Sequence, residues 1–194
     1  MVVIDATMLL LLLRPGTAVP ARPNGTPIDH PKERIDYLVK QLDKNKTKII
    51  VPTPALSEVL VRAGAAASQP IIEHLQRYSV FRIEPFDTRA AIEVAAMTRN
   101  AIDSGKGKRG GSAATWAKIK YDRQIVAIAK VCNADTIYSD DDDMASIAAA
   151  ANIKVIRLVD LPLPPQNAQH EMELTGVAEG APKLPGEGNA EEPT

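Results

Sequence analysis

The stretch Lys120–Met144, KYDRQIVAIAKVCNADTIYSDDDDM, decides the fold class of this chain. Its first part carries apolar residues at three- and four-residue spacing, which predicts an amphipathic helix that begins at Asp122. Residues 136–138 form a short β-branched and aromatic run, which predicts a buried strand. Four consecutive aspartates, 140–143, follow that strand at once. Because carboxylates this crowded repel one another, they need solvent or a bound cation, and the stretch points to a metal site.

Strands and helices alternate outward from this stretch in both directions. Short β-branched runs predict further strands at 2–4, 48–51, 80–83 and 154–158, and amphipathic runs predict helices between them. Such an order is typical of an α/β domain with a central, mainly parallel sheet, here of about four to five strands.

We assign the folded domain to residues 1–162, with two long loops inside it. The loop 14–30 carries four prolines, and the loop 104–115, SGKGKRGGSAAT, carries four glycines and three basic residues. Residues 163–194 are rich in Gly, Pro and Glu and poor in apolar residues, so we expect a disordered acidic tail.

The composition excludes several classes of protein. With one cysteine and three histidines among 194 residues, the chain forms no internal disulfide and no Cys/His zinc site. The apolar run 8–13 is too short to cross a membrane, and no basic leader precedes it, so we expect a cytoplasmic protein. Residues 166–194 hold six of the 24 acids and one of the 23 bases, so residues 1–165 carry about +4, a charge that suits a polyanionic substrate.

Acidic residues stand where the predicted strands end. Asp5 ends the first strand, the aspartate run ends the fourth, and Glu58 lies one turn into the helix after the second. Because the carboxyl ends of parallel strands share one edge of a sheet, we expect these acids to converge there. The place of Asp122 relative to that edge does not follow from this rule. Four carboxylates at one edge would hold Mg²⁺ or Mn²⁺, which prefer hard oxygen ligands.

Four segments carry a family resemblance. VVIDATMLLLLL, PALSEVL, KYDRQIVAIA and TIYSDDDDM, in this order, resemble the four acidic motifs of PIN domain nucleases, over residues 1 to about 160. The resemblance implies a PIN-like α/β/α sandwich and Mg²⁺- or Mn²⁺-dependent hydrolysis of RNA phosphodiester bonds. It assigns catalysis and metal binding to four positions: Asp5, Glu58, Asp122 and Asp141.

The fourth acidic position has two assignments. The family pattern fits if Asp141 binds the metal and Asp143 is an accessory acid, whereas a turn shifted by one residue would use Asp140 instead. Asp140 and Asp142 are otherwise expected to be solvated. On the same matching, Thr7 and Ser139 take accessory positions.

The resemblance also implies partners. We expect an RNA substrate contacted by basic residues near Asp122, an antitoxin protein if the chain is a toxin of the VapC type, and a homodimer. The expected RNA contacts are Lys106, Lys108, Arg109, Lys118 and Lys120. The alternative is a PIN-like module that binds RNA or protein with weak or no cleavage; a full set of acids favours the enzyme.

Other metal and phosphate sites are excluded by particular residues. Counted from Asp140, an EF-hand loop needs Gly at 145 and Glu at 151, where alanines stand. A haloacid-dehalogenase-like phosphatase needs a second aspartate where Thr7 stands, and a receiver domain needs an acid pair after the first strand, where only Asp5 is present.

Overall fold

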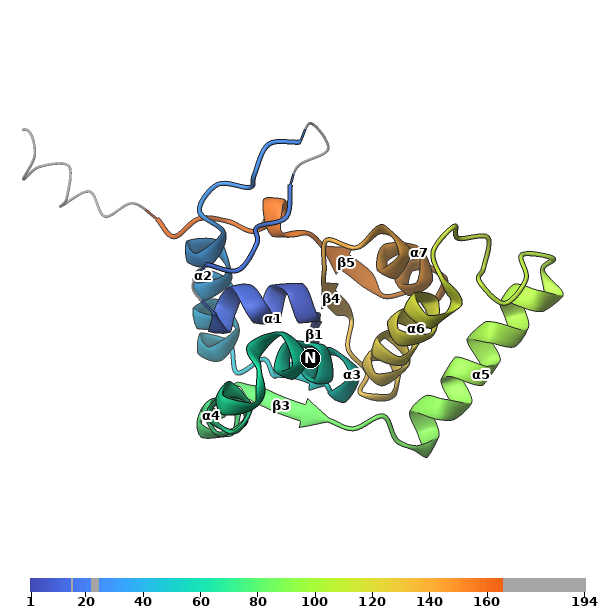
Figure 1. The fold of residues 1–194 in the computed structure, drawn as a ribbon, viewed down its shortest axis with the longest axis horizontal. Helices are drawn as coiled ribbons and strands as arrows, with labels where there is room; N and C mark the ends of the chain where they lie inside the picture. Colours follow the sequence, from blue (N-terminus) through green and yellow to red (C-terminus); the bar gives the residue numbers. More distant parts are fainter. Residues whose placement is uncertain (15, 22–24, 166–194) are drawn as a thin grey trace, which may run out of the picture. The chain divides into compact units, whose positions relative to one another are not determined.

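A computed structural model describes residues 1–14, 16–21 and 25–165 of the chain. Its centre is a sheet of five strands, all parallel, in the order β3-β2-β1-β4-β5 (Figure 1). The strands are β1 (Val2–Ile4), β2 (Ile49–Pro52), β3 (Phe81–Glu84), β4 (Thr136–Tyr138) and β5 (Lys154–Ile156). The predicted fold class, a parallel α/β sheet of four to five strands, is confirmed.

Helices connect the strands and flank the sheet. They are α1 (Ala6–Leu13), α2 (Pro31–Lys44), α3 (Thr53–Ala63), α4 (Ala65–Arg77), α5 (Thr88–Asp103), α6 (Trp116–Val131) and α7 (Asp142–Ala150), with a 3-10 turn, η1 (Leu158–Asp160), after β5. Among them α6 is the most central, since it packs against α3, α5 and α7 (Figure 1).

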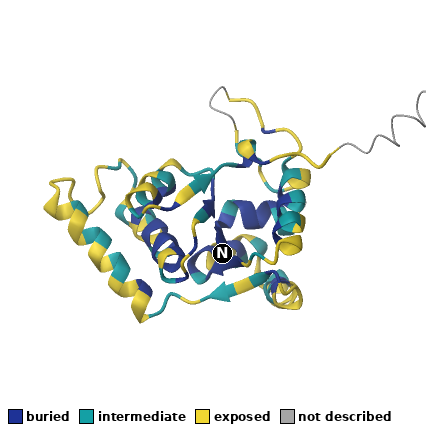
Figure 2. Ribbon diagram, turned by 180° about the vertical axis from the view of Figure 1, so that it is seen from behind, coloured by how far each residue is buried: buried dark blue, intermediate teal, exposed yellow. Residues whose placement is uncertain are grey.

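The three inner strands form the middle of the hydrophobic core. Val3 of β1 pairs with Ile50 of β2 on one side and with Ile137 of β4 on the other, and all three residues are fully buried. Strands buried on both faces read as continuous apolar runs, which is why their sequences predicted them. By contrast, α5 buries only Ala90 and is otherwise largely exposed (Figure 2).

One helix start differs from the sequence-based expectation, and a second is capped by an acid of the predicted site. Helix α6 begins at Trp116, where the Thr115 hydroxyl accepts a hydrogen bond from the Lys118 amide, so Asp122 lies about two turns inside the helix and does not open it. Helix α1 is capped by Asp5, whose carboxylate accepts a 2.8 Å hydrogen bond from the Met8 amide, and Thr7 lies within the helix. A strand-end acid therefore also serves as a helix cap.

Residues 1–164 form one compact unit. The acidic tail predicted at 163–194 lies outside the described residues from position 166 onward. Within the described ranges, no helix has the length and apolar character needed to cross a membrane.

Candidate metal centre

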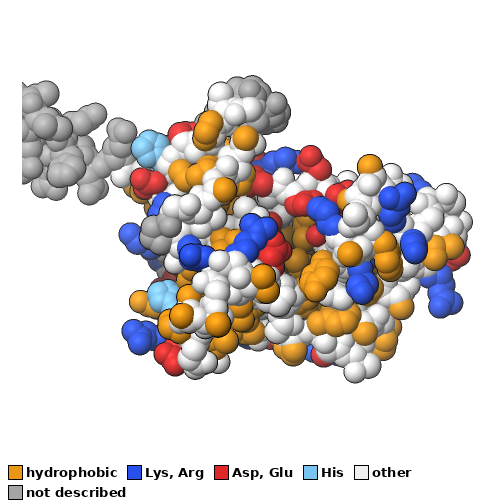
Figure 3. Space-filling model, viewed as in Figure 1, with side chains coloured by type: hydrophobic (Ala, Val, Ile, Leu, Met, Phe, Trp, Pro, Cys, Tyr) orange, Lys and Arg blue, Asp and Glu red, His pale blue; other side chains and the backbone are white. Residues whose placement is uncertain are grey.

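The four acids predicted to bind metal line one cleft. The cleft has a volume of about 670 Å³ and is bounded by α1, α3, α6 and the start of α7. Figure 3 shows a hollow on this face of the molecule, where acidic, basic and apolar side chains lie together. The acids on its wall are Asp5, Glu58, Asp122 and Asp141, and the predicted accessory residue Thr7 lies there too. Residues more than 130 positions apart in the sequence thus meet at the carboxyl ends of β1 and β4.

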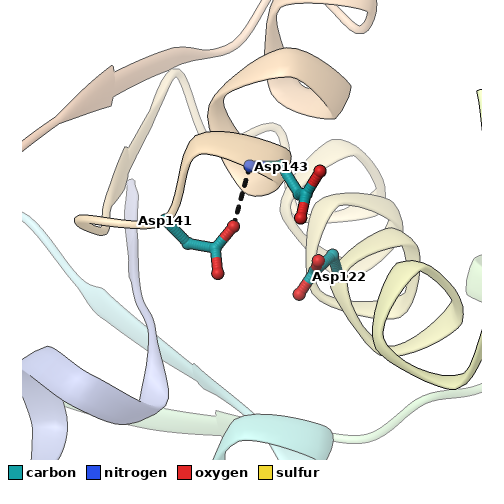
Figure 4. Close-up of side chains that lie close together, drawn as sticks. All are labelled: Asp122, Asp141 and Asp143. Atoms are coloured by element: carbon teal, nitrogen blue, oxygen red, sulfur yellow. Dashed lines mark hydrogen bonds between the residues drawn. The ribbon is translucent and has the colours of Figure 1, made fainter. Parts of the chain in front are cut away.

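Three aspartates form a tighter group within this region. Asp122 of α6 and Asp141 and Asp143 at the start of α7 each place one carboxylate oxygen within 4.8 Å of the other two (Figure 4). Asp143, which the motif matching made an accessory acid, therefore lies in the closest group. Asp5 and Glu58 lie on the wall of the cleft but do not belong to this group.

The turn between β4 and α7 fixes these carboxylates. Asp141 caps α7, and its Oδ1 accepts hydrogen bonds from the amides of Asp143 at 2.8 Å and Met144 at 3.1 Å (Figure 4). The Asp141 amide in turn donates to the hydroxyl of Ser139, which is fully buried. Because one Asp141 oxygen is held by the helix start, the direction of its carboxylate is set before any ligand binds.

The other two aspartates of the run face away from the group. Asp142 is exposed and forms an ion pair with Arg157. Asp140, expected to be solvated, is instead half-buried: its Oδ1 accepts a hydrogen bond from the Leu158 amide at 3.1 Å, and its Oδ2 is buried with no hydrogen-bond partner among the described residues. Burial raises the pKa of Asp140, an effect that the Leu158 hydrogen bond opposes.

Lys118 contacts all three grouped carboxylates. Its ammonium lies 3.0 Å from Asp122, 2.9 Å from Asp141 and 2.8 Å from Asp143. Partial burial acts to lower the pKa of Lys118, but the hydrogen bonds to Asp143, Asp141 and Asp122 outweigh it and raise that pKa. The group therefore already contains one positive charge.

Burial and charge act differently on the individual acids. Burial raises the pKa of Asp122 although Lys118 opposes the change, whereas the hydrogen bond from Lys118, together with one from Ser112 at 2.6 Å, lowers the pKa of Asp143. Asp5 is 6% exposed, and burial raises its pKa to about 7, against the lowering effects of its hydrogen bonds with Met8 and Ser139. A cation in the cleft would favour the charged form of each acid.

Glu58 has a different environment from the other acids. Its side chain is exposed and pairs with Arg62, one turn further along α3, at 2.6 Å. In this position it lies at the mouth of the cleft.

The expected RNA contacts fall in separate places. Lys118 lies among the carboxylates and Lys120 is exposed on α6, while Lys106 and Arg109 line a neighbouring cavity of about 480 Å³ that shares Asp143 with the acidic group. Lys108 lies over the ring of Trp116, 5.4 Å from its centroid. Basic side chains gather on the α5–α6 part of this face (Figure 3).

Sequence reasoning missed Arg123. This residue is 3% exposed, and its Nη1 donates to the Thr98 hydroxyl at 2.9 Å and to the Lys108 carbonyl at 2.6 Å. Its guanidinium also lies 5.7 Å from the Trp116 ring centroid. The available signal was a basic residue inside an otherwise core-facing helical stretch, next to a candidate ligand. Ser112, which donates to Asp143, was missed because loop residues give no periodic signal.

The donor set fits a hard divalent cation. The three grouped aspartates offer only carboxylate oxygens, the ligands that Mg²⁺ and Mn²⁺ prefer. The lysine ammonium among them is a cation in contact with the same oxygens, which shows that the group accommodates positive charge.

Comparison with known proteins identifies the fold. No family model and no curated protein matches the chain. Among solved structures, a chain in FitAB bound to an IR36 DNA fragment is similar, with 19% identity, a TM-score of 0.54, and coverage of 86% of this chain and 100% of that one. A chain of VapBC2 from Rickettsia felis, bound to a DNA fragment from its promoter, is similar at 14% identity and a TM-score of 0.53, with coverage of 81% and 98%. The resemblance to PIN domain proteins is confirmed at the level of the fold: this chain is a PIN-like α/β domain.

Proposed function

We propose that this chain is a divalent-metal-dependent ribonuclease that hydrolyses RNA phosphodiester bonds. The observation that carries the proposal is the convergence of Asp122, Asp141 and Asp143 within 4.8 Å, in the region of a cleft whose wall also holds Asp5 and Glu58. These carboxylates come from four separate elements of a PIN-like fold, and a chance surface cluster of acids does not explain that placement.

In this proposal the grouped aspartates would hold Mg²⁺ or Mn²⁺. Asp5 and Glu58, which line the same cleft, are the further ligands that the motifs predict. When bound there, such an ion would lower the pKa of a water and offset charge on the phosphate. The residues of the chain supply position: Asp141 is directed by the first turn of α7, and Asp143 by Ser112. Basic side chains around α5 and α6 attract the RNA backbone.

The decisive experiment compares one acid of the group with an exposed acid outside it. We expect Asp122→Asn to abolish Mn²⁺-dependent cleavage of total RNA while its circular dichroism spectrum stays native. Asp142→Asn is the matched control, because Asp142 is exposed and turned toward Arg157, and it should cleave like the wild type. Full activity of Asp122→Asn, or wild-type cleavage in excess chelator, would overturn the proposed mechanism. Wild-type protein that binds RNA without cleaving it would support the alternative, a PIN-like binding module.

We further propose that the chain is the toxin of a toxin-antitoxin pair and works in the cytoplasm. The support is the similarity of fold to chains of FitAB and VapBC2, each of which was solved bound to DNA. Expression in a bacterial host should arrest growth, and coexpression of the small protein encoded beside it should relieve the arrest. Normal growth during expression of active enzyme would mark a housekeeping nuclease instead.

A homodimer is the assembly we propose. Ile92 and Ile102 on α5 are 64% and 52% exposed, and burying such apolar side chains between copies would stabilise a dimer. Light scattering of the purified protein should give twice the 20.9 kDa chain mass.

A further inference from the structure

Lys118 makes an unusual set of contacts for a residue near a metal site. Its ammonium lies 2.8–3.0 Å from the same three carboxylates that would hold the ion. One of these acids, Asp122, is one turn further along α6, while Asp141 caps α7 and Asp143 lies in its first turn. Lys118 therefore links α6 to the start of α7 through contacts with the three carboxylates proposed to bind the metal.

We propose that Lys118 is a tethered cation: it fills the metal site while the metal is absent, leaves when a divalent ion binds, and then pairs with a phosphate of the RNA. This inference rests on the proposed function. On this proposal Lys118 first competes with the metal for the carboxylates and then contacts the substrate.

Charge and geometry support the competition. Three carboxylates this close repel one another, and a single ammonium offsets only part of their charge. A divalent ion offsets more and binds oxygen at about 2.0–2.2 Å, well inside the spacing of an ammonium contact. The ammonium contacts the same three carboxylates that offer oxygens to the ion, so the two cations compete for them.

The side chain of Lys118 is able to move away. It is 39% exposed, and a lysine has a flexible four-carbon stem that places its ammonium several ångströms from the backbone. Lys118 lines the same cleft as Asp5 and Asp141, so an ammonium released from the acids stays beside the site of any phosphate bound there. The net charge of three carboxylates, one divalent ion and this ammonium is zero before the phosphate enters.

The first test measures metal affinity without RNA. Lys118→Met removes the charge and keeps the apolar stem, and titration calorimetry should show Mn²⁺ binding about tenfold more tightly than in the wild type. Lys130→Met is the matched control, since Lys130 lies at the other end of the same helix, is exposed and pairs with Glu93, and it should bind Mn²⁺ as the wild type does. Weaker or unchanged Mn²⁺ binding by Lys118→Met would overturn the inference and assign Lys118 a purely structural role.

The second test follows the ammonium itself in the wild-type protein. Lysine acylation read by mass spectrometry should label Lys118 slowly in chelator and at least tenfold faster in saturating Mn²⁺, with Lys120 unchanged. Adding an uncleavable 2′-O-methyl RNA in Mn²⁺ should protect Lys118 again.

The outcomes separate this inference from the proposed function. Wild-type protein that binds no Mn²⁺ in calorimetry contradicts the metal-dependent function. Protein that binds Mn²⁺ while Lys118 stays protected contradicts the tethered cation alone, and absence of renewed protection by RNA contradicts the phosphate contact.

Discussion

Asp122 and Arg123 are consecutive residues of α6, both are buried, and their charges are compensated in opposite ways. Asp122 faces the cleft, where two further carboxylates and the Lys118 ammonium surround it. Arg123 faces the loop 104–115, and its described partners are neutral oxygens of Thr98 and Lys108 and the ring of Trp116. One side of the helix concentrates negative charge that needs a cation, and the other uses a cation to hold a loop. On the proposed function, Asp122 serves the chemistry, whereas Arg123 holds the structure of the loop.

The largest expected effect is on the cleft side. Asp141→Asn should lower Mn²⁺-dependent cleavage about 1,000-fold, which corresponds to about 4 kcal/mol of transition-state stabilisation. Asparagine still caps a helix, so the free energy of unfolding should change little. Initial rates on a defined RNA and urea unfolding measure the two quantities. A fall of less than tenfold in the cleavage rate would show that the acidic group on the cleft side of α6 does not carry the catalysis.

The free energy of unfolding should depend on pH because Asp5, a buried acid of the cleft, has a raised pKa. The pKa of Asp5 is about 7 in the folded chain against an ordinary 3.8, so the folded chain binds more protons between these values. The stabilisation from protonated Asp5 is full below about pH 4 and is lost as pH rises to about 7, a change of about 4 kcal/mol at 1.36 kcal/mol per unit. Urea unfolding in chelator at several pH values should show this loss in the wild type and not in Asp5→Asn. Equal pH profiles for both proteins would contradict it.

Substituting Arg123, on the loop side of α6, should lower the free energy of unfolding. Arg123→Met removes two hydrogen bonds from a charged donor and leaves the Thr98 and Lys108 oxygens without it, so we expect a loss of about 3 kcal/mol in the free energy of unfolding. Arg99→Met, on the exposed face of α5, is the control and should stay within about 0.5 kcal/mol. A stable Arg123→Met protein would show that the buried guanidinium is not an architectural anchor.

The smallest expected effect tests the link between the two sides. Ser112 belongs to the loop that Arg123 holds, and its hydroxyl donates to Asp143 of the acidic group at 2.6 Å. Ser112→Ala should cost about 1 kcal/mol and speed amide hydrogen exchange in residues 104–115. Unchanged exchange there would mean that the loop and the acidic group are independent.

The fold could be predicted from the sequence because the strands are continuous apolar runs and the helices are strongly periodic. Val2–Ile4 and Thr136–Tyr138 needed no long-range information to be recognised, and the strand-end rule then brought Asp5 and the aspartate run to one edge. The apolar periodicity placed the start of α6 too late, at Asp122, because the true cap, Thr115, lies in a glycine-rich loop without periodicity.

The finer arrangement of the site depends on the geometry of turns, which the sequence pattern does not predict. Asp143 joins the close group because Asp141 caps α7 and sets the direction of its first turn. The one-turn spacing of Lys118 and Asp122 was visible in the sequence, but the contacts of Lys118 with Asp141 and Asp143 join residues more than 20 positions apart. Arg123 was not singled out from the sequence, and its burial follows from its contacts with α5 and the loop 104–115.

The pairing of β1 with β4 also has a consequence for synthesis on the ribosome. Val3 and Ile137 are neighbours in the sheet, yet the second is made more than 130 residues after the first. Asp5 lies at the start of the compact unit and is made before the other acids, whereas Asp141 and Asp143 lie near its end. A nascent chain therefore lacks the complete acidic group until most of the compact unit has been made. On the proposed function, the message and ribosome that produce the chain are not exposed to cleavage before that point.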